Sequence, residues 1–109
     1  MIARRAVLLG ALALPAVVRA QGFAGTYAPE ATAIGDGIWL VRGADAELTF
    51  DNGGAIANIV VMASEAGAIL VDTGPSLGYG EALGALVRRL TGGLVAQVYI
   101  THLHPDHSF

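Results

Sequence analysis

The feature that most constrains this chain is its last stretch, Thr101-His102-Leu103-His104-Pro105-Asp106-His107. It places all three histidines of the sequence and one aspartate within six residues. The apolar run directly before it, Val95–Ile100, predicts a buried strand. Imidazole nitrogen and carboxylate oxygen at this density suit a borderline divalent ion such as zinc. The alternative is a polar, exposed turn that is rich in histidine by chance.

The spacing of these side chains divides them between two positions. Side chains two residues apart share one face of an extended backbone, so His102 and His104 can reach the same ion. Pro105 fixes its own φ and biases His104 toward extended geometry. Asp106 and His107 follow the bend and can address a second position close by. One strand end could therefore serve two metal ions.

The stretch THLHPDH resembles the HxHxDH signature of the metallo-β-lactamase superfamily, a specific short metal motif. The resemblance implies that His102 and His104 bind one metal and that Asp106 and His107 bind the other. The family completes its sites with a further His, a bridging Asp and a last His downstream, and no residue up to Phe109 can stand for these. We therefore expect the front part of a metallohydrolase, inactive as a fragment.

A second motif, LVDTG at residues 70–74, ends a strand predicted over Ala68–Asp72. Open sheets with helices commonly place their sites at such strand ends. LVDTG resembles the superfamily's other early motif, whose Asp supports the metal loop by hydrogen bonding and is not itself a ligand. The resemblance gives this supporting role to Asp72. The residues alone also allow a simple strand-end cap.

The rest of the chain predicts a mixed sheet with one main helix. Strands are expected at 38–42, at 56–62 with both faces covered, and at 68–72, the last two joined by a hairpin at 64–67. A helix is expected from the N-cap Ser76 to Gly92-Gly93. Its apolar stripe consists of Leu83, Leu86, Val87 and Leu90. The class is α/β, and the resemblance makes it the first half of an αββα sandwich, truncated after Phe109.

The roles of the loop at residues 43–52 and of the polar residue Asn58 are open. Residues 43–52 predict a surface loop, which in the metallo-β-lactamase family often borders the mouth of the active site. Phe50 within it is expected to form a wall of that mouth or a hydrophobic plug. Asn58 lies in the middle of an apolar strand and needs hydrogen-bond partners if it is buried. We expect it to be structural, with lining of the site as the alternative.

The N-terminus predicts export. Arg4 and Arg5 precede the apolar segment Ala6–Val18, and Val18-Arg19-Ala20 fits a cleavage site, so residues 1–20 are expected to be a signal peptide. The apolar segment is short for a membrane span, so no stable anchor is expected after cleavage, and an uncleaved anchor is the alternative. Twin-arginine export and ordinary secretion both lead to the periplasm or the exterior. Residues 21–34 show little periodicity and predict a flexible mature N-terminus, and residues 35–109 the metallo-β-lactamase-like domain.

Composition excludes several other kinds of site and partner. The sequence has no cysteine, so disulfides and thiolate ligands are absent. Three of the six basic residues belong to the predicted signal peptide, which leaves three basic residues against nine acidic ones, an excess of six negative charges. An acidic protein of this kind does not favour nucleic acid or an anionic membrane surface.

The leading hypothesis is an exported zinc-dependent metallohydrolase with a small-molecule substrate. Zinc, as one or two ions, would supply hydroxide that attacks an ester, thioester, lactone or lactam, and Asp106 would orient it as the catalytic residue. The segment GGAIANIVVM is similar to exported metallohydrolases associated with quinoprotein and sulfur-oxidation systems. The alternatives are an iron-dependent redox or sulfur-handling enzyme on the same ligands and a non-catalytic metal-binding domain.

Overall fold

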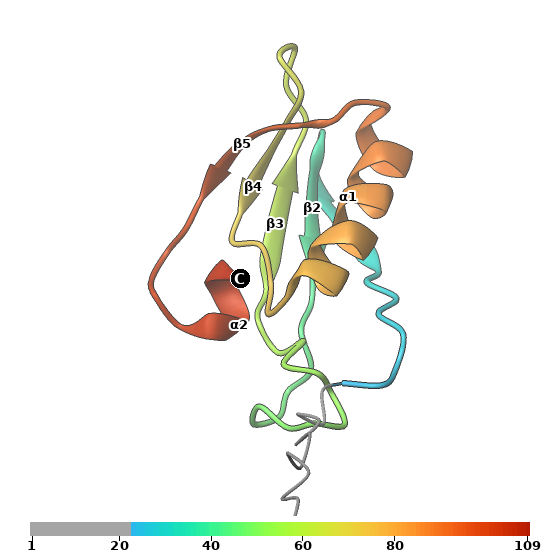
Figure 1. Ribbon diagram of the computed structural model, residues 1–109. Helices are drawn as coiled ribbons and strands as arrows, with labels where there is room; N and C mark the ends of the chain where they lie inside the picture. Colours follow the sequence, from blue (N-terminus) through green and yellow to red (C-terminus); the bar gives the residue numbers. More distant parts are fainter. Residues whose placement is uncertain (1–22) are drawn as a thin grey trace, which may run out of the picture.

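A computed structural model describes residues 23–109 of the chain. The predicted signal peptide, residues 1–20, lies outside the described residues. Figure 1 shows a sheet with one long helix at its side and a short helix near the C-terminus. The elements in chain order are β1 (Ala31–Gly35), β2 (Ile38–Val41), β3 (Ile59–Met62), β4 (Ala68–Val71), α1 (Leu77–Thr91), β5 (Val95–Tyr99) and α2 (Pro105–Ser108). Among the described helices, none is long and apolar enough to cross a membrane.

The direction of the strands brings the two sequence motifs together. The five strands lie in chain order in one sheet, antiparallel from β1 to β4, while β5 pairs parallel with β4. A parallel pair needs a crossover, which α1 supplies. Because β4 and β5 run in the same direction, Asp72 and Thr101 follow their strands at the same edge of the sheet (Figure 1). The α/β class and the predicted hairpin between β3 and β4 are confirmed.

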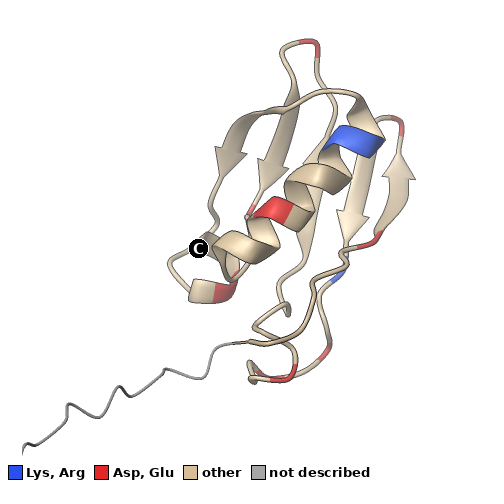
Figure 2. Cartoon of the chain, turned by 45° about the vertical axis from the view of Figure 1, so that its right-hand side comes forward, with Lys and Arg blue, Asp and Glu red and all other residues tan. Residues whose placement is uncertain are grey.

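The helix α1 covers one face of the sheet, as Figures 1 and 2 show. The Tyr79 N–H donates to the Ser76 side chain at 3.2 Å, and Gly92 ends the helix in a left-handed conformation. Both predicted helix ends are therefore confirmed. The core joins the apolar stripe of α1 to the covered face of β2, β3 and β4, and each large side chain buried there contributes about 1.5–3 kcal/mol. Its members are Val41, Ile59, Val61, Ala68, Leu70, Tyr79, Leu83, Leu86 and Val87.

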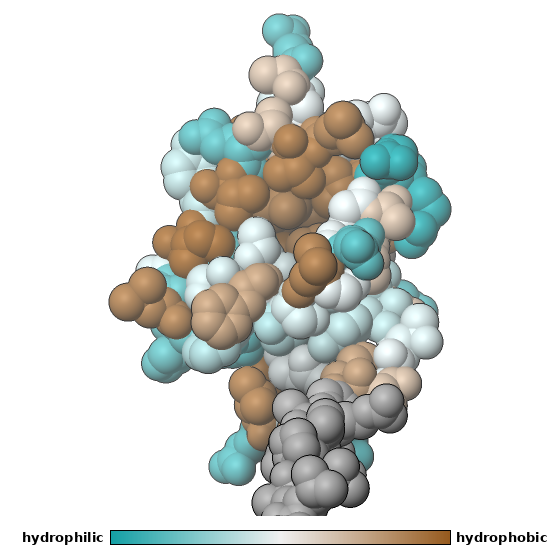
Figure 3. All heavy atoms as spheres, viewed as in Figure 1, coloured by the Kyte–Doolittle hydropathy of each residue, from teal (hydrophilic) through white to brown (hydrophobic). Residues whose placement is uncertain are grey.

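The opposite face of the sheet and the strand β5 remain open. Along β3, Ile59 and Val61 are buried while Val60 and Met62 are only half-buried, so the prediction of two covered faces is wrong here. All positions of β5 are exposed, so the prediction of a buried strand at 95–100 is wrong as well. The reason is its place at the sheet edge: among the described strands only β4 pairs with it, and the core contains no residue of it. Figure 3, viewed from the side on which α1 lies, shows hydrophobic residues also gathered on that face of the molecule.

The predicted flexible N-terminus, residues 21–34, is wrong for its last part. Residues from Ala31 form β1, which pairs antiparallel with β2 through the register Ala31↔Val41 and Thr32↔Leu40. Before it, the Tyr27 hydroxyl donates to the Gly53 carbonyl at 2.8 Å. The run of Ala, Thr and Gly carries little strand propensity of its own. Its order comes from hydrogen bonds to β2, which a local sequence pattern does not contain.

Two glycine substitutions should change stability in opposite directions. Gly74 has a φ of +95°, and a Cβ there would overlap the ring of Tyr79. We expect Gly74→Ala to lower the free energy of unfolding by about 2–4 kcal/mol through backbone strain and overpacking. Gly84 lies within α1 with no atom near its Cβ position, so Gly84→Ala should raise it by about 0.5–1 kcal/mol. Urea unfolding followed by circular dichroism measures both, and equal effects would contradict the packing described here.

Candidate metal centre

Backbone hydrogen bonds join the two sequence motifs directly. The Asp72 N–H donates to the Tyr99 carbonyl at 2.8 Å, and the Thr73 N–H donates to the His107 carbonyl at 2.9 Å. The Phe109 N–H donates to the Gly74 carbonyl at 3.0 Å. The short helix α2, which carries Asp106 and His107, is thereby fixed against the end of β4. LVDTG and THLHPDH form one structural unit.

Asp72 is the buried centre of this unit. Its side chain is 2% exposed, and its backbone has a φ of +65°, a conformation that costs about 1–3 kcal/mol in a residue other than glycine. The carboxylate accepts from the Thr101 N–H at 2.8 Å, from the Thr101 hydroxyl at 2.8 Å and from His107 Nδ1 at 2.7 Å. These partners stabilise both the buried charge and the strained backbone.

The pKa of Asp72 lies below its usual value. Burial raises the pKa, but the hydrogen bonds from the Thr101 backbone, the His107 ring and the Thr101 hydroxyl, together with the charge of His107, lower it by more. Asp72 is therefore an ionised carboxylate at neutral pH and accepts hydrogen bonds without donating any. The predicted supporting role agrees with this arrangement.

An acceptor-only Asp72 determines which ring nitrogens carry protons. His107 must place its proton on Nδ1 to reach the carboxylate. The Thr101 hydroxyl donates its one hydrogen to Asp72. The lone pair on the Thr101 oxygen therefore accepts a hydrogen bond from His102 Nδ1 at 2.8 Å. When their rings are neutral, both histidines therefore keep an Nε2 lone pair, the form in which imidazole binds metal. Asp72 orients His107 directly and His102 through Thr101.

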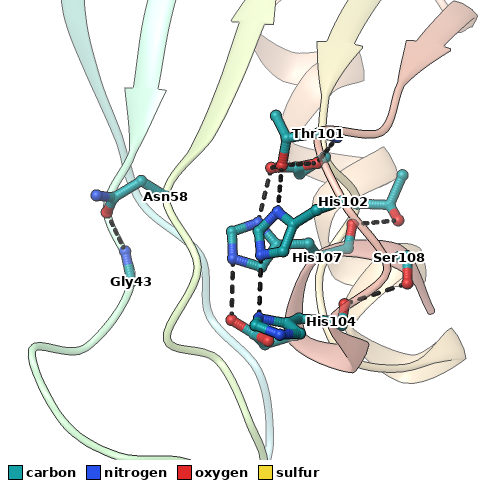
Figure 4. A network of polar contacts seen from close by, with 10 residues as sticks. Gly43, Asn58, Thr101, His102, His104, His107 and Ser108 are labelled. Atoms are coloured by element: carbon teal, nitrogen blue, oxygen red, sulfur yellow. Dashed lines mark hydrogen bonds and ion pairs between the residues drawn. The ribbon is translucent and has the colours of Figure 1, made fainter.

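The candidate metal-binding atoms lie in two pairs. His102 Nε2 is 3.1 Å from His104 Nδ1, and His107 Nε2 is 3.1 Å from a carboxylate oxygen of Asp106. Two ligands of a tetrahedral zinc ion with bonds of 2.0–2.1 Å lie roughly 3.3 Å apart. The rings of His104 and His107 both pack against His102, with centroids 4.6 and 4.2 Å from it (Figure 4). All four predicted ligands are thus brought to one place.

The donor pairs fit a metal ion in chemistry and spacing, but each is only part of a coordination shell. Within residues 23–109, no three His, Asp or Glu side chains are arranged to hold a single ion. The predicted division, with His102 and His104 at one metal position and Asp106 and His107 at another, stays a prediction, and the structure adds that each pair is in contact at 3.1 Å. His102 and His104 are exposed, whereas His107 is half-buried.

The family model of the metallo-beta-lactamase superfamily matches residues 52–109, which contain both motifs. This chain belongs to the metallo-beta-lactamase superfamily. No curated protein matched it. Members of this superfamily typically bind metal ions, and the superfamily covers hydrolases and other enzymes. The sequence resemblance through THLHPDH and LVDTG is confirmed at the level of the family.

Two residues near the centre have roles that the sequence left open or missed. Figure 4 shows Asn58 turned toward Gly43, whose N–H donates to the Asn58 side-chain oxygen at 3.0 Å. Asn58 is therefore structural, and it fixes the start of the loop between β2 and β3. The sequence did not assign a role to Thr101, the first residue of THLHPDH. A hydroxyl residue directly before a histidine ligand was the available signal.

Proposed function

We propose that this chain carries the metal-binding centre of an exported zinc-dependent hydrolase. One observation carries the proposal. His107 Nε2, with its proton placed on Nδ1 by Asp72, faces a carboxylate oxygen of Asp106 at 3.1 Å. Two lone pairs at this distance repel each other unless a proton or a cation lies between them. One divalent cation would satisfy this pair, and a second would satisfy the neighbouring pair of His102 and His104.

Each residue of the centre has a distinct role in this proposal. His102 and His104 hold one ion, and His107 and Asp106 hold the other. Asp106 also accepts a hydrogen bond from the attacking water and so orients it. When bound, zinc supplies a nucleophilic hydroxide at neutral pH and polarises the scissile group. Asp72 and Thr101 are positioning residues, since their side chains hydrogen-bond to each other, to the Thr101 N–H and to the rings of His102 and His107.

The substrate class is a small carboxylic acid derivative: an ester, thioester, lactone or lactam. Nitrogen and oxygen donors without thiolate suit zinc, and they also suit iron. The identity of the bound metal therefore distinguishes a zinc-dependent hydrolase from an iron-dependent redox enzyme. A protein that binds metal but shows no turnover would be a non-catalytic metal-binding domain.

Metal titration of the purified chain tests the proposal. After removal of metal by a chelator, we expect calorimetry to show at least one zinc ion bound per chain, more tightly than ferrous iron. The complete product of the gene that encodes this sequence should hydrolyse an ester and lactam panel, lose turnover with chelator and regain it with zinc. Hydrolysis that survives the chelator, or a chain that binds no zinc, would contradict the proposal. A preference for iron would favour the redox alternative.

A further inference from the structure

The turn of residues 72–76 joins β4 to α1 and makes contacts in two directions. Its first three residues hydrogen-bond to the metal loop, residues 101–109. The side chain of its last residue, Ser76, hydrogen-bonds instead to Tyr27 of the N-terminal segment, residues 23–30. The turn therefore lies between the metal loop and a part of the chain that is far from that loop in sequence.

The hydroxyl of Tyr27 connects the N-terminal segment to two other parts of the fold. It donates to the Gly53 carbonyl at 2.8 Å and accepts from the Ser76 hydroxyl at 3.2 Å. The Ser76 oxygen in turn accepts from the Tyr79 N–H at 3.2 Å and so caps α1. One hydroxyl thus links the loop between β2 and β3 to the start of α1, at the end of the turn.

The ring of Tyr27 seats the N-terminal segment on the core. It packs against Phe23 with ring centroids 4.5 Å apart and meets Tyr79 edge-on at 5.2 Å. A Cβ at Gly53 would overlap the Phe23 ring and the Tyr27 hydroxyl, so the segment lies directly on the Gly53 backbone. Contacts this close on two sides show that Tyr27 anchors the N-terminal segment.

Tyr79 carries the contact from the N-terminal segment to the metal loop. Its side chain is 4% exposed, and a Cβ at Gly74 would overlap its ring, so the ring lies against the Gly74 backbone. The Gly74 carbonyl accepts from the Phe109 N–H at 3.0 Å. Packed and hydrogen-bonded groups therefore run without a gap from Tyr27 through Tyr79 and Gly74 to the end of the metal loop.

The turn between these two parts has a backbone that depends on its surroundings. Asp72 has a φ of +65° and Gly74 a φ of +95°. A residue other than glycine keeps a positive φ only where the surrounding structure fixes it. The metal loop fixes the turn on one side, and the N-terminal segment fixes it on the other. A looser turn would place the Asp72 carboxylate less accurately against His107.

We propose that Tyr27 is a positioning residue for the metal centre. The N-terminal segment holds the turn of residues 72–76, and the turn holds the metal loop in the arrangement in which its side chains face one another. The inference rests on the proposed function where it concerns metal affinity. The hold on the loop itself is a property of the chain without metal, so the two parts can be measured separately.

Tyr27→Phe tests the inference because it removes the hydroxyl and keeps the ring. A hydrogen bond changes an equilibrium by about two- to tenfold net. We expect the Thr73 and Phe109 amides, which join the turn to the metal loop, to exchange with solvent about two- to tenfold faster in the zinc-free chain. Zinc affinity should fall by about two- to thirtyfold, as for other substitutions that act on a site through intervening residues. Tyr27→Ala should have larger effects, since it also removes the ring contacts.

Thr91→Val is the matched control at the opposite end of α1. The Thr91 hydroxyl also makes two hydrogen bonds, donating to the Val87 carbonyl at 2.9 Å and accepting from the Gly93 N–H at 3.2 Å. Its loss should leave zinc affinity and the exchange of the Thr73 and Phe109 amides within about twofold. Urea unfolding compares the stability of both variants, so that an effect on the metal loop is distinguished from a loss of overall stability.

Failure of the inference and failure of the proposed function give different results. Unchanged amide exchange in Tyr27→Phe would overturn the inference, and so would faster exchange with unchanged zinc affinity, which would leave a purely structural contact. Equal losses of zinc affinity in Tyr27→Phe and Thr91→Val would overturn it as well. An unchanged chain that binds no zinc would overturn the proposed function, while faster exchange in Tyr27→Phe would still establish that the N-terminal segment holds the loop.

Discussion

Asp72→Ala is expected to destabilise the fold and to abolish tight metal binding together. The substitution removes the one acceptor for the Thr101 N–H, the Thr101 hydroxyl and His107 Nδ1 at a site that is 2% exposed. Each buried donor left without a partner costs about 1–3 kcal/mol. Alanine is also less tolerant than aspartate of the backbone φ of +65° at this position. We expect the free energy of unfolding to fall by about 3–5 kcal/mol, as for breaking a buried charged pair.

Asp72→Asn distinguishes the contribution of Asp72 to stability from its contribution to metal affinity. Asparagine keeps the size of the side chain and can still accept from the Thr101 N–H. Its amide group is a donor, however, so His107 can no longer place its proton on Nδ1 against two acceptor oxygens. His107 then carries the proton on Nε2, which removes the lone pair that faces Asp106. We expect a smaller loss of stability but a loss of about 10–100-fold in metal affinity, as for other supporting partners of histidine ligands.

The measurements for both Asp72 variants are urea unfolding, zinc titration and nitrogen NMR of the imidazole rings. The NMR signal reports the tautomer of His107, which a purely structural role of Asp72 would not move. Asp36→Ala, in the exposed turn between β1 and β2, is the matched control and should change stability by no more than about 0.5 kcal/mol. An unchanged His107 tautomer in Asp72→Asn would show that the carboxylate does not direct the ring.

The candidate metal centre could be recognised in the sequence because its residues are close together and chemically unusual. Three imidazoles and a carboxylate in THLHPDH allow few interpretations other than a metal site, and LVDTG marks the end of the neighbouring strand. The contact between Asp72 and His107 spans 35 residues, and the resemblance predicted only that Asp72 supports the metal loop by hydrogen bonding. The link from Asp72 to His102 through Thr101 depends on the direction of the Thr101 hydroxyl hydrogen. That direction follows from the geometry around Asp72, which no local pattern contains.

The sequence predicts those elements whose bounds depend on local residue patterns. It does not predict those that depend on pairing with a strand distant in the sequence. The ends of α1 follow from Ser76 and Gly92, whose capping roles are local. The strand β1 depends on pairing with β2, and the exposure of β5 depends on its place at the sheet edge. A run such as Val95–Ile100 reads the same in a central strand and in an edge strand. Phe50 was predicted as part of an apolar wall, but the apolar pocket of about 330 Å³ that it lines could not be predicted, since that pocket joins Phe23 to residues as distant as Pro105.

His104→Ala is expected to remove metal from the first position with little effect on the fold. His104 is exposed, and its side chain makes no cap hydrogen bond at the start of α2, so its loss disturbs no buried contact. Alanine cannot supply the nitrogen that faces His102 Nε2 at 3.1 Å. Loss of a supporting partner alone costs about 10–100-fold in metal affinity, so loss of a ligand should cost more than about 100-fold.

Leu103→Ala is the matched control for this prediction, because Leu103 lies between the two histidines and is 91% exposed. It should leave the zinc affinity within about twofold, since it removes no donor atom. Zinc titration and metal analysis after dialysis measure both variants, with urea unfolding as the check on the fold. If His104→Ala binds zinc as tightly as Leu103→Ala, then His102 and His104 do not share an ion. The nitrogen pair would then be a hydrogen bond between two exposed rings, and the metal centre would reduce to Asp106 and His107.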